Sequence, residues 1–164
     1  MKKLITSLCL IVTLAIGSFG VGWSGDFQKG LDAAQRGDYT TALKEWTSLA
    51  EQGDAKAQFN VGIMYDNGQG VLQDYKTAVK WYILSAEQGY AKAQYNLGVM
   101  YALGQGVIED KVYAHMWGNI LNSNGHEDGK KIMDYLLKQG MTPSQIEEAE
   151  RLARVCVKKN YKGC

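Results

Sequence analysis

A 36-residue repeat constrains this chain more than any other feature. Residues 54–89 and 90–125 align without a gap and are identical at 16 of 36 positions. The second half of the unit occurs once more, at 37–53, again 36 residues before its copy at 73–89. Periods of about 20–50 residues are typical of solenoids, in which each unit covers the apolar face of its neighbour. The chain is therefore predicted to form a stack of similar units.

Each unit is predicted to contain two helices. The first, at about 55–67, has small and apolar residues at helical spacing, and Gly68 and Gly70 end it because glycine accepts positive φ. Asp74 is a suitable N-cap for the second helix, at about 75–88. No stretch shows the alternation that is typical of a β-strand. The pattern predicts an all-α solenoid of about four helical hairpins.

Four aromatic residues recur at the 36-residue spacing, as the pairs Tyr65/Tyr101 and Trp81/Trp117. Large rings at helical spacing are more often packing residues than ligand-binding ones. We therefore assign all four to the core.

The end units differ from the central ones, as terminal units of a stack usually do. Residues 26–53 are predicted to form a degenerate N-terminal hairpin, and residues 126–164 a C-terminal helical cap. The last helix has a clear start, because Thr142 can act as N-cap and Gln145 can complete a capping box. The helices expected in these end units lie at about 26–36, 38–52, 127–139 and 143–158.

The first residues have the layout of a secretory signal peptide. Lys2 and Lys3 precede an apolar run from 4 to 16, and small residues follow. The run is shorter than the ~20 residues of a membrane span. We predict a signal peptide at 1–24, cleaved between 20 and 25; an uncleaved membrane anchor is the alternative. The protein is then expected to be periplasmic or secreted and to meet a membrane only transiently, during export.

Charge and composition exclude several classes of protein. Removing the leader takes away two lysines and no acidic residue, which changes the formal net charge from +1 to −1. Such a chain lacks the positive charge with which nucleic-acid binders neutralise phosphates. A hydrophobic fraction of 46% excludes a disordered chain. Histidines and cysteines do not cluster, so we expect no metal site and no cofactor. From the charge we expect no nucleic-acid partner, and we expect the protein to be a monomer.

Cys156 and Cys164 remain after the leader is removed. Two nearby thiols in an oxidising compartment usually pair. A continuous helix would hold their Cα atoms ~12 Å apart, beyond the ~7 Å limit of a disulfide. The helix must therefore end and reverse, and Asn160 and Gly163 are suitable for that reversal. We predict a terminal disulfide; a redox-active pair, which would lack the CxxC spacing, is the alternative.

The central units share a specific motif. In the second unit its positions are Ala93, Leu97, Gly98, Met100, Tyr101, Gly104, Gly106, Val107, Asp110, Ala114 and Trp117. The first unit matches it with Val61 in the leucine place and closes with Glu87-Gln88-Gly89. This motif resembles the Sel1-like repeat, a relative of the tetratricopeptide repeat. With the weaker end units the resemblance covers residues 26 to about 140; the second unit departs at its close, at 122–124.

The resemblance implies a right-handed α/α solenoid that acts as an adaptor in protein complexes. Some cysteine-rich secreted relatives bind or hydrolyse β-lactams, so an enzyme acting on β-lactams or cell-wall material is the alternative function. Those relatives carry a cysteine pair in each repeat, whereas this chain has one pair, at its end. The chain also has no G-x-S-x-G, H-E-x-x-H or S-x-x-K motif. We therefore expect no enzymatic activity.

The two histidines have structural interpretations. His115 takes the place that Val79 has in the preceding unit, so we expect a packed helix residue. His126 follows Gly125 at a helix start, where a polar residue is expected.

The binding surface is predicted on the first helix of each unit, which in the tetratricopeptide fold lines a concave groove. The stripe left over after packing is Lys56, Phe59, Asn60 and Ile63 in the first unit, and Lys92, Tyr95, Asn96 and Val99 in the second. Asparagine can bond a peptide backbone, lysine can meet a carboxylate, and the rings can cover apolar side chains. The alternative is that the rings belong to the core and the lysines are only solvated.

A third hypothesis places the partner elsewhere. A structural or assembly partner could use the convex face or the acidic last helix, where Glu147, Glu148 and Glu150 point toward water. The leading hypothesis stays an exported adaptor that binds a protein or peptide in its groove.

Overall fold

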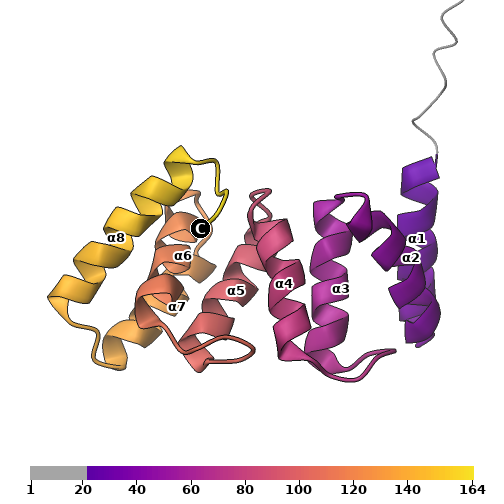
Figure 1. Cartoon of the computed structure of the whole chain (residues 1–164), viewed down its shortest axis with the longest axis horizontal. Helices are drawn as coiled ribbons and strands as arrows, with labels where there is room; N and C mark the ends of the chain where they lie inside the picture. Colours follow the sequence, from indigo (N-terminus) through magenta and orange to yellow (C-terminus); the bar gives the residue numbers. More distant parts are fainter. Residues whose placement is uncertain (1–21) are drawn as a thin grey trace, which may run out of the picture.

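The computed structural model describes residues 22–164, and this part of the chain forms eight α-helices and no strand. Successive helices pack side by side along the molecule, except the last, which packs against the sixth (Figure 1). Their bounds are α1 Gly22–Gln35, α2 Tyr39–Glu51, α3 Ala55–Asn67, α4 Tyr75–Ala86, α5 Ala91–Leu103, α6 Lys111–Ser123, α7 Asp128–Lys138 and α8 Pro143–Lys158. The predicted leader lies outside the described residues, except for its last three, which belong to α1.

The helix ends follow from local chemistry. The side chains of Asp54, Asp74 and Asp110 accept hydrogen bonds from backbone N–H groups in the first turns of α3, α4 and α6. Thr142 and Gln145 form the predicted capping box at the start of α8. Gly68 ends α3 in the left-handed conformation, with φ of 68°. The predicted helix boundaries are thus confirmed to within a few residues.

Glycines hold each connecting loop against the preceding hairpin. Gly70 and Gly106 have φ of 71° and 72°. A Cβ at Gly70 would lie 2.6 Å from the carbonyl oxygen of Tyr39, and one at Gly106 would lie 2.3 Å from that of Tyr75. Each loop therefore rests on the first residue of the second helix of the unit before it. The repeat spacing of these glycines reflects a contact between units and not only a turn.

A substitution within the repeat ends the regular stack. Trp46, Tyr82 and Gly118 occupy the same place in successive units. A Cβ at Gly62 would lie 2.6 Å from the Tyr82 ring, so the ring sits directly on the glycine of the facing helix. At Gly118 no ring is present, and a Cβ there would lie 3.0 Å from the carbonyl oxygen of Gly129 in α7. The missing ring lets α7 approach α6 closely, and α8 also packs against α6.

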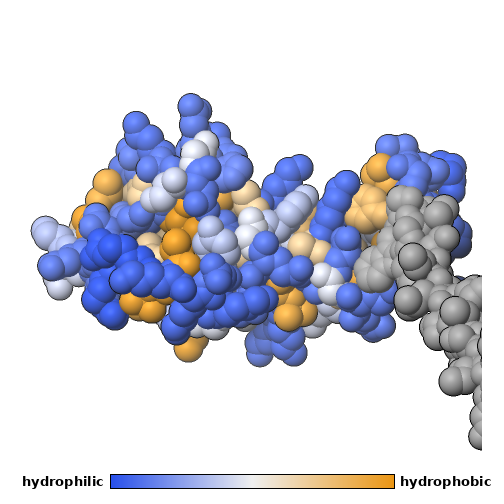
Figure 2. Space-filling model, turned by 90° about the horizontal axis from the view of Figure 1, so that it is seen from above, coloured by the Kyte–Doolittle hydropathy of each residue, from blue (hydrophilic) through white to orange (hydrophobic). Residues whose placement is uncertain are grey.

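The assignment of the repeated aromatic residues to the core is confirmed most fully at Trp117. Its side chain is 1% exposed, whereas Trp81, Tyr65 and Tyr101 are half-buried and pack against the buried clusters. On the face seen in Figure 2, hydrophobic residues lie in small patches between hydrophilic ones.

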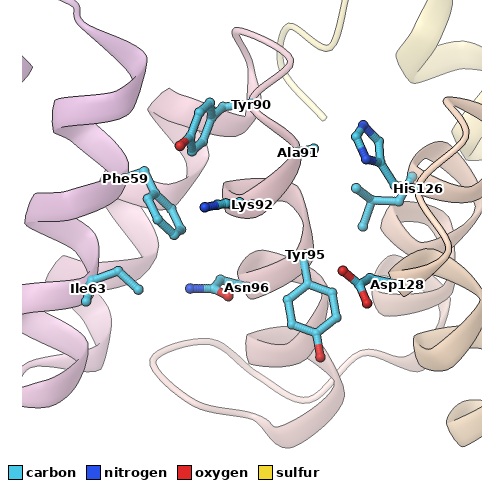
Figure 3. A pocket seen from close by; sticks show the side chains of 10 residues that line it. Phe59, Ile63, Tyr90, Ala91, Lys92, Tyr95, Asn96, His126 and Asp128 are labelled. Carbon is cyan, nitrogen blue, oxygen red and sulfur yellow. The ribbon is translucent and has the colours of Figure 1, made fainter.

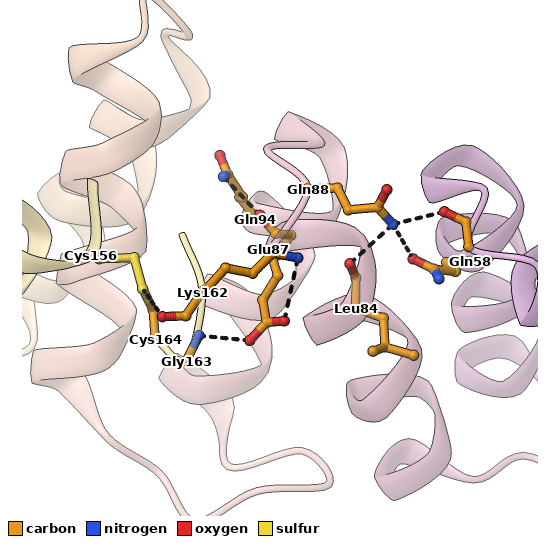
Figure 4. A network of polar contacts seen from close by, with 11 residues as sticks. Gln58, Leu84, Glu87, Gln88, Gln94, Cys156, Lys162, Gly163 and Cys164 are labelled. Carbon is orange, nitrogen blue, oxygen red and sulfur yellow. Dashed lines mark hydrogen bonds and ion pairs between the residues drawn. A yellow bond between two sulfur atoms is a disulfide. The ribbon is translucent and has the colours of Figure 1, made fainter. Parts of the chain in front are cut away.

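Buried glutamines link the hairpins. Gln58 and Gln94 donate hydrogen bonds to carbonyls in the last turns of α2 and α4, at 3.1 and 3.2 Å (the second is drawn in Figure 4). The Oε1 atom of Gln58 accepts a hydrogen bond from Gln88 at 2.8 Å. Its counterpart on Gln94 is buried and has no partner among the described residues. Asn124 replaces Gln88 in that unit, is one methylene shorter, and donates to the Tyr161 hydroxyl instead.

The chain reverses after α8 as predicted. Asn160 and Gly163 have φ of 50° and 64°, and the Cα atoms of Cys156 and Cys164 lie 5.6 Å apart. This separation lies within the range that a disulfide needs. The structure thus brings the two sulfur atoms together, and the pairing remains a prediction.

Candidate functional site

A pocket of about 560 Å³ lies where α3, α5 and the start of α7 meet. Most of its lining is apolar or aromatic, as is usual for binding sites in proteins. In Figure 3, Lys92 and Asn96 of α5 point toward the Phe59 side, while His126 and Asp128 stand on the opposite side. Its lining residues are Phe59, Ile63, Tyr90, Ala91, Lys92, Tyr95, Asn96, Leu121, His126 and Asp128.

The pocket gathers five of the eight side chains that the sequence predicted for the groove: Phe59, Ile63, Lys92, Tyr95 and Asn96. Val99 lines an adjacent hollow of about 310 Å³ between α5 and α7, to which Tyr95 also contributes. The two hollows therefore follow one face of α5 from its first to its last turn. We call this pair of hollows the α5 groove.

Lys56 and Asn60 do not line the α5 groove. The ammonium group of Lys56 lies 4.2 Å from the centre of the Phe27 ring, a cation–π contact with α1. Lys92 occupies the same place one unit later, is exposed, and has no ion-pair partner among the described residues. The two lysines, equivalent in sequence, thus have different surroundings.

The aromatic wall of the pocket is pre-formed. The Phe59 ring centre lies 5.2 Å from that of Tyr90 and 5.9 Å from that of Tyr82. Tyr82 is fully buried, and its hydroxyl donates a 3.0 Å hydrogen bond to Asp66. Burial and the nearby Asp66 carboxylate raise the pKa of Tyr82 far above its usual range. This hydroxyl therefore stays neutral and has a structural role behind the Phe59 wall.

The end of the pocket at the start of α5 is suited to an anion. Tyr90 is the N-cap of α5 and makes no side-chain capping bond, whereas Asp54 caps α3 at the same place. The first turn of α5 contains no acidic residue and carries Lys92. Uncapped N–H groups, the helix dipole and the lysine all favour negative charge there. Asp128 across the pocket is already paired with Lys131, at 2.6 Å.

Comparison with known proteins identifies the repeat. A family model for the Sel1 repeat matches residues 55–90 and 91–126. This chain contains two Sel1 repeats. The matched Sel1 repeats begin one residue after the units found by self-alignment, so the period is the same. Proteins built from Sel1 repeats typically mediate protein–protein interactions and are typically not enzymes.

Two solved structures share this Sel1 architecture. A protective antigen of uropathogenic Escherichia coli strains with an SLR fold is 28% identical, with a TM-score of 0.78, over 85% of this chain and 30% of that one. A Sel1 repeat protein from Oxalobacter formigenes is 30% identical, with a TM-score of 0.65, over 81% of this chain and 55% of that one. This chain therefore corresponds to only part of each. No curated protein matches it. The predicted right-handed α/α solenoid is confirmed.

Half of the pocket lies outside the predicted stripe. Tyr90, Ala91, Leu121, His126 and Asp128 were not assigned to the groove from the sequence. One signal was present, because Tyr90 replaces the capping aspartate of the preceding Sel1 repeat. Leu121 lies on α6, His126 in the α6–α7 connection and Asp128 at the first position of α7. The chain departs from the repeat pattern at 122–124, so the pattern could not place His126 and Asp128.

His115 is a packed residue, as its place in the repeat predicted. Its side chain is 4% exposed, and it borders a polar hollow between α6, α7 and α8 with Lys130, Asp134 and Glu150. Burial lowers the pKa of His115, and the Glu150 carboxylate opposes that shift only in part. The imidazole is therefore neutral in the folded protein near pH 7.

This burial predicts a pH-dependent stability. Because the pKa of His115 is lower in the folded than in the unfolded chain, the unfolded chain binds more protons below about pH 6.5. The contribution of His115 to the free energy of unfolding should be complete above this pH, and it should be lost as the pH falls through the pKa that His115 has in the folded protein. We expect His115→Val, which restores the residue of the preceding repeat, to flatten this part of the profile. Urea unfolding between pH 7.5 and pH 5 measures the free energy of unfolding of both proteins. If this free energy depends on pH equally in the variant and the wild type, His115 is not the group responsible.

No group of three or more histidine, cysteine, aspartate or glutamate side chains within residues 22–164 could hold a metal ion. No helix in this range is both long and apolar enough to cross a membrane.

Proposed function

We propose that this protein is an exported interaction scaffold that binds a segment of a protein partner in the α5 groove. The observation that carries the proposal is the run of two hollows along one face of α5, lined by Tyr95 at their junction. The Sel1 repeats support the general role, since this family typically joins proteins to one another. The two hollows support a contact along α5.

The chemistry of the groove supports a partner segment that carries both acidic and apolar side chains. Lys92 and the uncapped start of α5 can pair with a carboxylate. Phe59, Tyr90 and Tyr95 can cover apolar side chains beside it, and burial of such rings dominates the energetics of many interfaces. We propose that the carboxylate lies at the α5 start and the apolar side chains follow the helix.

The test is a cross-linked pull-down from the envelope and culture medium of the exporting cell. The bait is the wild-type protein or the double variant Lys92→Ala/Tyr95→Ala. The variant removes the free cation and the ring shared by both hollows, so we expect at least a tenfold loss of the captured partner, or about 1.4 kcal/mol. Since an ion pair contributes, added salt should weaken wild-type capture more than variant capture.

The matched control is Lys80→Ala/Leu84→Ala on α4. It also removes one exposed lysine and one partly exposed apolar side chain, but neither residue lines the groove. Circular dichroism and thermal melts establish that both variants are folded. Equal losses in the two variants, or no loss in either, would place the contact outside the α5 groove and contradict the proposal.

A further inference from the structure

The tail after α8 reaches far back along the chain. Residues 159–164 leave the end of α8 and dock against the α4–α5 turn, more than 70 positions earlier in sequence (Figure 4). The backbone N–H of Gly163 donates a 2.8 Å hydrogen bond to the carboxylate of Glu87, and the Lys162 ammonium lies 3.9 Å from the same carboxylate. The Tyr161 ring lies against Gly89, where an added Cβ would approach it to 3.3 Å.

The backbone of this tail is held in an unfavourable conformation. Asn160, Tyr161 and Gly163 have φ of 50°, 65° and 64°. Asparagine and glycine tolerate this region, but a bulky residue such as tyrosine rarely adopts it. A conformation of this kind persists only where its surroundings hold it in place. Here the surroundings are the Glu87 contact, the Asn124 bond to the Tyr161 hydroxyl at 3.0 Å, and the predicted disulfide between Cys156 and Cys164.

The docking point adjoins the α5 groove. Tyr90 follows Gly89 directly, lines the larger hollow and faces the Phe59 ring. Its backbone N–H bonds the carbonyl of Ser85, and its own carbonyl accepts the first N–H bonds of α5. Contacts thus run without a gap from the cysteine pair, through the tail and the α4–α5 turn, to the wall of the groove.

We propose that the C-terminal tail is a redox-sensitive clasp that holds the α4–α5 turn, and with it the Tyr90 wall of the α5 groove, in its observed position. A dithiol reductant would break the S–S bond and supply two electrons and two protons. Cys156 and Cys164 would become thiols while the reductant closes to its own disulfide. The freed tail then relaxes from its left-handed conformation and leaves Glu87. That the clasp affects binding rests on the proposed function; the clasp itself does not.

Amide hydrogen exchange of the oxidised and the dithiothreitol-reduced protein tests the clasp without any ligand. We expect reduction to speed exchange about tenfold in peptides covering 87–94, where the Tyr90 bonds lie. The α1–α2 junction at 35–42 has equivalent backbone bonds, from Gly37, Asp38 and Ala42, and lies in the first hairpin, away from the tail (Figure 1), so its exchange should change less than twofold. Equal change at both junctions, or no change at 87–94, would overturn the proposal.

A second pair of variants keeps the cysteine link and covers the case in which reduction unfolds the protein. Glu87→Ala removes the acceptor of the tail and should speed exchange at 87–94 several-fold. Glu51→Ala removes the equivalent glutamate of the preceding repeat, which is exposed, and should leave 51–58 unchanged. No effect of Glu87→Ala would overturn the clasp. A clear effect there, with unchanged partner capture, would retain the clasp and contradict a groove that uses Tyr90.

Discussion

Replacing Gly106 with alanine is expected to lower the free energy of unfolding by about 3–5 kcal/mol. Two costs add at this position. Its φ of 72° costs an alanine about 1–2 kcal/mol, and the new Cβ would lie 2.3 Å from the carbonyl oxygen of Tyr75. Backbone cannot move aside as a side-chain end can, so the loop must lift from α4. Urea denaturation followed by circular dichroism measures the loss.

Gly140→Ala is the matched control for this prediction. Gly140 has φ of 80°, but nothing lies within 4 Å of an added Cβ. It should lose only the conformational cost, about 1–2 kcal/mol. If Gly106→Ala destabilises the protein no more than Gly140→Ala does, the loop does not rest on the preceding unit as described.

Truncating Trp117 to alanine is expected to cost about 3–5 kcal/mol, because this ring is 1% exposed and its removal leaves a large cavity. Trp81 fills the same place in the preceding Sel1 repeat but is half-buried. The difference follows from what covers each helix. α6 packs against α5, α7 and α8, whereas α4 packs chiefly against α3 and α5.

Trp81→Ala should therefore cost clearly less, about 1–2 kcal/mol. Trp117→Phe provides a further check, since the indole N–H of Trp117 is buried without a partner among the described residues. Removing it loses no hydrogen bond, so the phenylalanine variant should be much more stable than the alanine one. Thermal and urea unfolding measure both variants. If Trp81→Ala and Trp117→Ala lower the free energy of unfolding equally, α7 and α8 do not bury Trp117 more deeply than Trp81 is buried.

The helices could be predicted because their signals are local. Asp74 caps the next turn of its own chain, and Gly68 ends the helix that precedes it. Such bonds join residues a few positions apart, so the order of residues determines them directly. The 36-residue period likewise required units of one shape to stack.

The groove could be predicted only in part. Its stripe follows helical spacing, which placed Phe59, Lys92 and Tyr95 on one surface. Spacing could not show that Lys56 instead lies over Phe27, because that contact joins two hairpins. It also could not place His126 across the pocket from Lys92, since the chain departs from the repeat at 122–124, just before His126.

The amino-acid sequence by itself determined the helices, their ends, the repeat and the reversal after α8. The tertiary structure decided which of two equivalent residues is covered, as with Trp81 and Trp117, and where the tail docks. Periodicity and capping depend on residues that are neighbours in the chain, and the sequence gives the order of those residues directly. Burial and docking depend on which distant element lies opposite, as Glu87 does for Gly163, and only the folded arrangement brings such residues together.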